Sequence, residues 1–128
     1  MFRHAVRVHP EECCGILVGR RCGTECMVER IVEAANISEV GRARSYQICW
    51  RALLSTARAT REGPSDILGF YHSHPDGSDR PSGHDLATAW IDYSYVILAV
   101  RDGCCLGATS WRVSGEGRPF EPETVCPA

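Results

Sequence analysis

The chain has 128 residues, of which 44% are hydrophobic and 23% are charged, so it is long enough to bury one globular core. A net charge of −2 offers no basic surface for nucleic acid or for an anionic membrane. No apolar run reaches the roughly 20 residues that span a bilayer, and none follows residues 1–4 as in a signal peptide, so we expect one cytoplasmic domain over residues 1–128.

The first half of the chain predicts two helices with two strands between them. In chain order we expect a helix over 2–9, strands over 13–18 and 25–34, and a helix over 46–61. Pro10 ends the first helix, because a proline disfavours the helical conformation in the residue before it. Ser45 is a suitable N-cap for the second helix.

The second half predicts three further strands and one short helix. In chain order we expect a strand over 67–71, a helix over 82–90 and strands over 93–101 and 104–113. Asp102-Gly103 is a typical hairpin turn between the last two strands. The tail over 118–122 is expected to be extended and peripheral. These elements predict a single α/β domain with a mixed sheet and helices packed against it.

Eight cysteines raise the question of disulfides or a zinc finger. Without a signal peptide, a secreted disulfide scaffold is disfavoured. Cys22-x-x-x-Cys26 lacks a second cysteine pair at matching distance. We therefore expect most of the cysteines to be small buried hydrophobic residues rather than ligands.

The most informative motif is His72-Ser73-His74-Pro75, followed by Ser82 and Asp85. Residues two apart in a strand point to the same face, so both imidazoles can converge on one point. Two neutral imidazoles, one carboxylate and an open fourth position are the ligand set of a catalytic zinc. The motif predicts Zn²⁺ bound by His72, His74 and Asp85 in a metal-dependent hydrolase.

Ser82 and Asp85 have a second interpretation. Ser-x-x-Asp before an apolar stretch is also a capping box at the start of a helix, and Pro81 strengthens that interpretation. Both can hold together, because the helix start fixes Asp85 while the Ser82 hydroxyl remains available to donate to an oxyanion.

The spacing His-Ser-His, seven residues, then Ser-x-x-Asp resembles the JAMM signature of the MPN-plus (Mov34/MPN/PAD-1) metalloproteases. That family also has a glutamate three residues before a glycine upstream, which corresponds to Glu12 and Gly15. Residues 9–15, His-Pro-Glu-Glu-Cys-Cys-Gly, are similar to the opening of its small bacterial branch. The resemblance implies a curved mixed sheet flanked by a long and a short helix, a cytidine-deaminase-like architecture. It also implies that Glu12, rather than Glu11, moves a proton from water to the leaving amine.

The same resemblance implies hydrolysis of an amide after the Gly-Gly tail of a small ubiquitin-like sulfur-carrier protein. Peptidases of that branch process such carriers, for instance by removing a C-terminal cysteine. Three alternatives remain: a non-catalytic MPN scaffold, a member of the DNA-repair-associated RadC family, and a general peptidase of small peptides. The complete ligand set argues against the scaffold. The absence of a basic patch argues against the RadC family.

Overall fold

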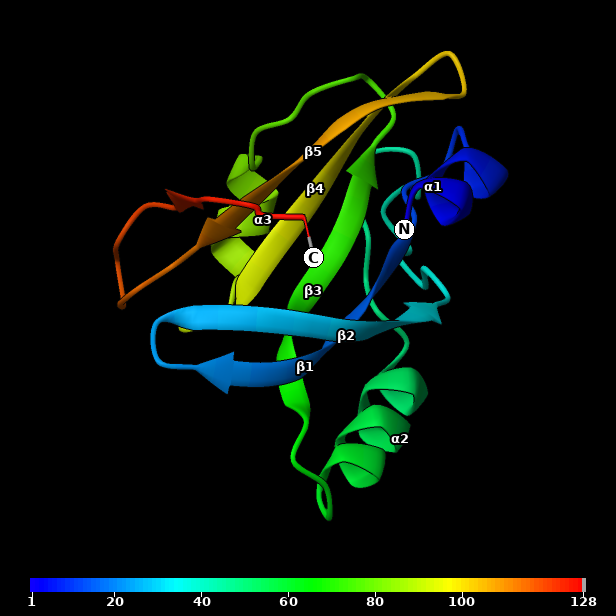
Figure 1. Ribbon diagram of the computed structural model, residues 1–128. Helices are drawn as coiled ribbons and strands as arrows, with labels where there is room; N and C mark the ends of the chain where they lie inside the picture. The colour runs from blue at the N-terminus through cyan, green and yellow to red at the C-terminus, as the bar shows by residue number, and fades with distance from the viewer. Residues whose placement is uncertain (128) are drawn as a thin grey trace.

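The structure is a computed structural model that describes residues 1–127. The helices are α1 (Phe2–Val8), α2 (Trp50–Thr60) and α3 (Gly83–Thr88). The strands are β1 (Cys14–Cys22), β2 (Glu25–Ala34), β3 (Asp66–His74), β4 (Ser94–Arg101), β5 (Cys104–Arg112) and β6 (Glu121–Glu123) (Figure 1).

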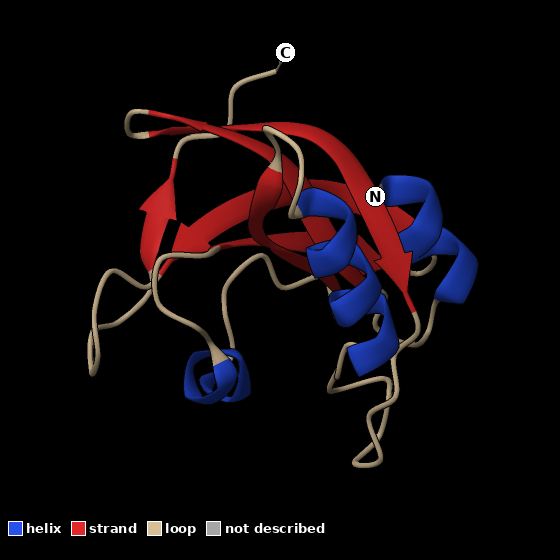
Figure 2. Ribbon diagram, turned by 90° about the horizontal axis from the view of Figure 1, so that it is seen from below, coloured by secondary structure: helices blue, strands red, loops and turns tan. Residues whose placement is uncertain are grey.

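The six strands form one mixed sheet in the order β2-β1-β3-β4-β5-β6. Strand β3 lies between β1, to which it is antiparallel, and β4, to which it is parallel. Parallel neighbours cannot be joined by a tight turn, so the chain crosses over between β3 and β4, and this crossover carries α3. The sheet is strongly curved (Figure 2). The predicted α/β domain with a curved mixed sheet is confirmed.

The sheet has an apolar cluster on each face. On one face Ala5 of α1 packs with Leu17, Tyr71 and Leu98. On the other face Ile16, Phe70 and Tyr95 pack with side chains from α2 and from the end of α3. Both faces of β3 are buried, and successive side chains of the strand alternate between them. Tyr71 therefore lies on the face covered by α1, while its neighbours point to the face covered by α2 and α3.

Helix α2 begins later than the sequence predicts. Its N-cap is Cys49 rather than Ser45, and residues 45–48 are extended. An isolated β-bridge joins Asn36 to Ile48, and this tertiary pairing outweighs the capping preference of Ser45. The prediction of a helix from residue 46 was wrong for its first turn.

Two strand boundaries also differ from the predictions. Strand β1 continues to Cys22, because it pairs with β2 along the whole hairpin. The tail over 118–122 is not merely peripheral: β6 pairs with the end of β5. The eight cysteines are free within the described residues, but only Cys13 and Cys14 are buried, so the expectation that most of them are buried was wrong. No helix among the described residues is long and apolar enough to cross a membrane.

Candidate metal centre

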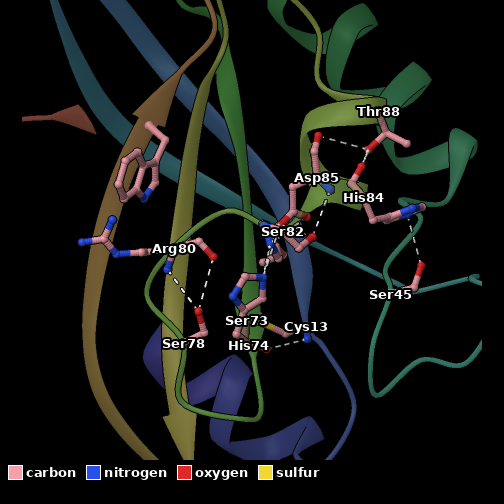
Figure 3. Close-up of polar contacts among 12 residues, drawn as sticks. Cys13, Ser45, Ser73, His74, Ser78, Arg80, Ser82, His84, Asp85 and Thr88 are labelled. Carbon is pink, nitrogen blue, oxygen red and sulfur yellow. Dashed lines mark hydrogen bonds and ion pairs between the residues drawn. The ribbon is translucent and has the colours of Figure 1, made fainter. Parts of the chain in front are cut away.

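Strand β3 delivers His72 and His74 to the same face of the sheet, as the motif predicts. Their Nε2 atoms lie 3.0 Å apart, and both residues are buried. Ser73 points to the opposite face, where its Oγ accepts a hydrogen bond of 2.8 Å from the backbone N–H of Cys13 (Figure 3). This hydroxyl is therefore structural and faces away from the histidines.

Helix α3 positions Asp85 through a capping box. Ser82 is the N-cap, its Oγ accepts from the N–H of Asp85 at 3.1 Å, and the Asp85 carboxylate accepts from the N–H of Ser82 at 2.6 Å. Both interpretations of Ser-x-x-Asp are compatible with this geometry. The Ser82 hydroxyl also donates to Asp85 Oδ2 at 2.7 Å, so its proton is engaged inside the box, and its role toward an oxyanion stays a prediction.

The two histidines and Asp85 form one buried cluster. His72 Nε2 lies 3.2 Å from Asp85 Oδ1, and His74 Nε2 lies 3.3 Å from Asp85 Oδ2. One ligand atom from each of the three residues lies within 4.8 Å of the others. Converging imidazole nitrogens and a carboxylate suit a divalent transition metal such as zinc. The donor set therefore fits a metal ion.

One further atom supports coordination through Nε2. The Nδ1 of His72 is buried and has no hydrogen-bond partner among the described residues. Metal-bound imidazoles usually hold their second nitrogen by an outer hydrogen bond. His72 lacks such a bond among the described residues, and its ring is held instead by Tyr46, which stacks on it with ring centroids 4.3 Å apart.

Burial and contacts among His72, His74 and Asp85 shift the pKa of each residue. Burial lowers the pKa of His72, so its imidazole is kept neutral, the form that binds metals. Burial also disfavours charge on His74, but the hydrogen bond and charge of Asp85 raise its pKa overall. Burial opposes ionisation of Asp85, yet the hydrogen bonds from both histidines hold the pKa of its carboxyl well below the usual range.

Glu12 lies at the entrance to β1 and is only 6% exposed. Burial raises the pKa of its carboxyl to about 7, while the charge of His74 lowers it and that of Asp85 raises it. Glu11, the competing carboxylate, is exposed to solvent. The structure therefore separates two glutamates that are adjacent in the sequence and places Glu12 beside the cluster.

The loop between β2 and α2 contributes side chains that the sequence analysis missed. Tyr46 covers His72, and Ser45 Oγ lies 3.3 Å from Nε2 of His84, which extends toward it from α3 (Figure 3). The pattern Asn36-x-Ser38 is typical of a local Asx turn, but no local pattern indicates that its loop reaches the metal ligands.

A cavity of about 380 Å³ opens beside the cluster, between this loop and α3. Its walls are mainly apolar and aromatic, with a polar side at Ser45 and His84. The same loop side chain, Tyr46, lines the cavity and stacks on His72. The cavity therefore lies next to the cluster, with Tyr46 between its interior and His72, and it has the mainly apolar character of a substrate pocket.

The buried cysteines near the cluster are unreactive. Cys14 is fully buried, and its thiol donates to the carbonyl oxygen of Ala34 at 3.7 Å. Burial raises the pKa of Cys14 to about 12 and that of Cys13 to about 11. A nucleophilic cysteine needs a lowered pKa, so neither residue is a nucleophile.

Three known proteins are similar to this chain. It is 33% identical over 95 residues to a probable TtuB-protein conjugate cleaving protease of Thermus thermophilus, covering 74% of this chain and 60% of that protein. It is 31% identical to the desampylase of Haloferax volcanii, covering 70% and 63%. It is 29% identical to a CysO-cysteine peptidase of Mycobacterium tuberculosis, covering 98% and 84%. The matches to the first two span less than two thirds of those proteins.

Solved structures and a family of known domains are also similar to this chain. A protein of Desulfitobacterium hafniense superposes with a TM-score of 0.80 at 29% identity, covering 96% of this chain and 82% of the other. A JAB1/MPN domain protein of Archaeoglobus fulgidus shares the fold, with a TM-score of 0.54 at 16% identity over 87% of this chain and 79% of the other. Residues 1–114 match the family described as prokaryotic homologs of the JAB domain. The chain therefore belongs to the family of prokaryotic homologs of the JAB domain.

Proposed function

We propose that this chain is a zinc-dependent peptidase that hydrolyses the amide bond after the Gly-Gly tail of a small ubiquitin-like sulfur-carrier protein. The observation that carries the proposal is the buried convergence of His72, His74 and Asp85 beside an apolar pocket. The names of the relatives, a conjugate-cleaving protease, a desampylase and a CysO-cysteine peptidase, support the substrate class. We also propose that the reaction takes place in the cytoplasm, where the free thiols stay reduced.

In this proposal Nε2 of His72, Nε2 of His74 and a carboxylate oxygen of Asp85 would hold the metal. When bound there, zinc supplies Lewis-acid activation of water and of the scissile carbonyl. The buried walls around the three ligands strengthen these electrostatic effects, because few solvent dipoles screen them.

Glu12 carries the proton in the proposed reaction. Its carboxylate accepts a proton from the attacking water and passes it to the nitrogen of the leaving amine. Its burial and its interactions with His74 and Asp85 support this role. Ser82 is proposed to stabilise the developing oxyanion once its hydroxyl turns from Asp85 toward the substrate.

The cavity between the loop and α3 is proposed to hold the carrier tail. Glycines carry no side chain, so a Gly-Gly segment can lie close to Tyr46 and reach the ligand cluster. Aromatic and apolar walls suit an uncharged peptide backbone more than an acidic or basic side chain. Complete retention of the ligand set supports an enzyme over a non-catalytic scaffold.

The test is mass spectrometry of a small sulfur carrier fused, after its Gly-Gly, to one residue or a short peptide. Zinc-loaded protein should release the extension and leave a free Gly-Gly carboxylate. A matched fusion with the penultimate glycine changed to Val should resist cleavage, because a β-branched side chain does not fit a groove sized for backbone. Equal cleavage of the Val fusion, or of unrelated peptides, would show a general peptidase instead. No cleavage of any fusion by the zinc-loaded protein would refute the peptidase proposal.

A further inference from the structure

We propose that Asn36 is a positioning residue that fixes the backbone of Glu12 against the loop over 37–49. This inference deepens the proposed function and rests on it, because Glu12 is the proposed proton carrier. Asn36 follows the end of β2 and is half-buried. It does not belong to the ligand cluster itself.

The carboxamide of Asn36 is fully hydrogen-bonded to backbone groups. Its Nδ2 donates to the carbonyl oxygens of Glu12, at 3.1 Å, and of Ser45, at 3.0 Å. Its Oδ1 accepts from the N–H groups of Ser38, at 3.0 Å, and of Gln47, at 3.1 Å. A carboxamide has two donors and two acceptor positions, so all four are used.

The chemistry of these four partners fixes the orientation of the amide. Two are carbonyl oxygens and two are N–H groups, so a flipped carboxamide would set oxygen against oxygen and N–H against N–H. No other amino acid of this size offers two donors and two acceptors in that plane. The site therefore selects asparagine by its hydrogen bonds rather than by its volume.

The bonds of Asn36 join the two halves of the proposed site. The N–H of Glu12 donates to the carbonyl oxygen of Arg42 at 2.7 Å, so the loop and Asn36 together hold both backbone polar groups of Glu12. Ser45 and Gln47, bonded by Asn36, flank Tyr46, which stacks on His72. Asn36 thereby couples the position of Glu12 to the loop that covers a metal ligand.

Glu12 depends on this arrangement because it lies at the entrance to β1, where strand pairing begins only at Cys14. A proton carrier must be placed closely, since a misplacement of about 1 Å can cost on the order of 100-fold in rate. We infer that Asn36 contributes to turnover through the position of the Glu12 backbone, while the metal is held by other residues.

Two substitutions test the NH2 group and the oxygen of the Asn36 carboxamide separately. Asn36→Asp keeps an oxygen for Ser38 and Gln47 but sets a carboxylate oxygen against the carbonyls of Glu12 and Ser45. Asn36→Ala removes both halves. Glu39→Gln is the matched control: it makes the reverse isosteric exchange at an exposed residue of the same loop that forms no hydrogen bond with the described residues.

The first readout needs no substrate. Amide hydrogen exchange followed by NMR should show faster exchange of the Glu12 N–H in Asn36→Asp, with the Ser38 and Gln47 amides close to the parent. All three amides should exchange faster in Asn36→Ala, and none in Glu39→Gln. Parent-like exchange of Glu12 in Asn36→Asp overturns the proposal, whatever the chain cleaves.

The second readout separates positioning from a general structural defect. Asn36→Asp should keep its zinc and lower kcat roughly 10- to 100-fold, with KM changed by no more than about threefold. In a Glu12→Gln background the same substitution should have little further effect on residual turnover, because both changes act on one group. A positioning role is contradicted if Asn36→Asp lowers activity by raising KM or by releasing zinc. It is also contradicted if the effects of Asn36→Asp and Glu12→Gln on turnover are additive.

The two readouts distinguish failure of this inference from failure of the proposed function. Suppose that the parent protein cleaves no carrier fusion but the Glu12 N–H exchanges faster in Asn36→Asp. That result would refute the peptidase proposal and would still support the contact between Asn36 and the Glu12 backbone. A parent protein that cleaves the fusion while Asn36→Asp matches it in kcat refutes the role of Asn36 alone.

Discussion

Two adjacent glutamates have opposite surroundings at the start of β1. Glu12 is buried and bonded through its N–H to the loop, whereas Glu11 is exposed. Glu11 lies in the bend that follows the turn after α1, whereas Glu12 leads into β1, so a single step along the chain moves a carboxylate from solvent to the ligand cluster. Position, rather than residue type, distinguishes the two.

Glu12→Gln should therefore abolish most turnover without releasing the metal. We expect a loss on the order of 100-fold or more, the usual scale for a positioned acid–base group. Glu11→Gln is the matched control and should be close to the parent. Steady-state kinetics on the carrier fusion, with elemental analysis of each variant, measure both effects. Equal losses in the two variants would mean that the wrong carboxylate has been assigned.

His4 carries a pH-dependent part of the stability. It is a buried residue of α1, and its Nδ1 lies 2.8 Å from the Tyr71 hydroxyl. Burial lowers the pKa of His4 below its ordinary value of 6.5. As the pH falls through that value, the unfolded chain takes up this proton before the folded protein does, so stability is lost on acidification and is fully present above it.

His4→Gln should reduce this pH dependence, because glutamine stays neutral. The free energy of unfolding, measured with urea at about pH 7 and about pH 5, should fall less on acidification in the variant than in the parent. An equal fall in both proteins would show that His4 does not titrate differently in the folded and unfolded states.

The ligand cluster could be predicted from the spacing of residues that are close in sequence, whereas contacts between distant residues could not. His72 and His74 share a face because strand periodicity is local, and Asp85 is fixed by a cap only three residues away. Asn36 and Tyr46 escaped prediction because their partners, Glu12 and His72, lie more than twenty residues away in the sequence. Long-range contacts leave no periodic signal.

At the scale of elements, β3 and β4 approach each other closely at Gly69. A Cβ built at this position would lie 1.9 Å from the carbonyl oxygen of Ser94, its partner in the parallel register. The backbone cannot give way without displacing the start of β4. The glycine therefore sets the approach of the strand that carries the metal ligands.

Gly69→Ala should destabilise the protein by roughly 3 kcal/mol, the upper range for overpacking a closed site. Gly107→Ala is a matched control in β5, because no atom lies within 4 Å of its added Cβ. Urea unfolding of the two variants gives the comparison. Parent-like stability in Gly69→Ala would show that the two strands separate at little cost.

The strand and helix boundaries show where tertiary contacts outweigh local preference. The strand predicted over 25–34 matches β2, which pairs with β1 along the whole hairpin. Helix α2 starts at Trp50, not at residue 46, because the Asn36–Ile48 bridge holds the preceding segment extended. Strand β6 has three residues, too few to show a period of two.

At the scale of the whole molecule, the strand order assembles the site from three separate segments. Antiparallel pairing of β1 with β3 sets Cys14 opposite His72 and so brings Glu12 toward the histidines. The β3–β4 crossover carries α3 and Asp85 back over the same face, and the loop after β2 covers it. A metal bound there would link β3 to α3 through His72, His74 and Asp85.

Zinc should consequently stabilise the folded chain as a whole. Because the ligand atoms converge only in the folded state, free zinc at 100 times its Kd should add about 2.7 kcal/mol. For a chain of this length that corresponds to a rise in Tm of about 10 °C. Differential scanning fluorimetry with zinc and with a chelator measures the shift.

The double variant His72→Ala with His74→Ala should lose that zinc-dependent shift, although its own Tm will differ from the parent. It also controls for zinc at surface thiols, because Cys22, Cys104 and Cys126 are exposed and remain available in both proteins. The comparison is therefore the change in Tm on adding zinc, not the Tm itself. If the double variant is stabilised by zinc as strongly as the parent, the metal binds elsewhere and the buried cluster is not its site.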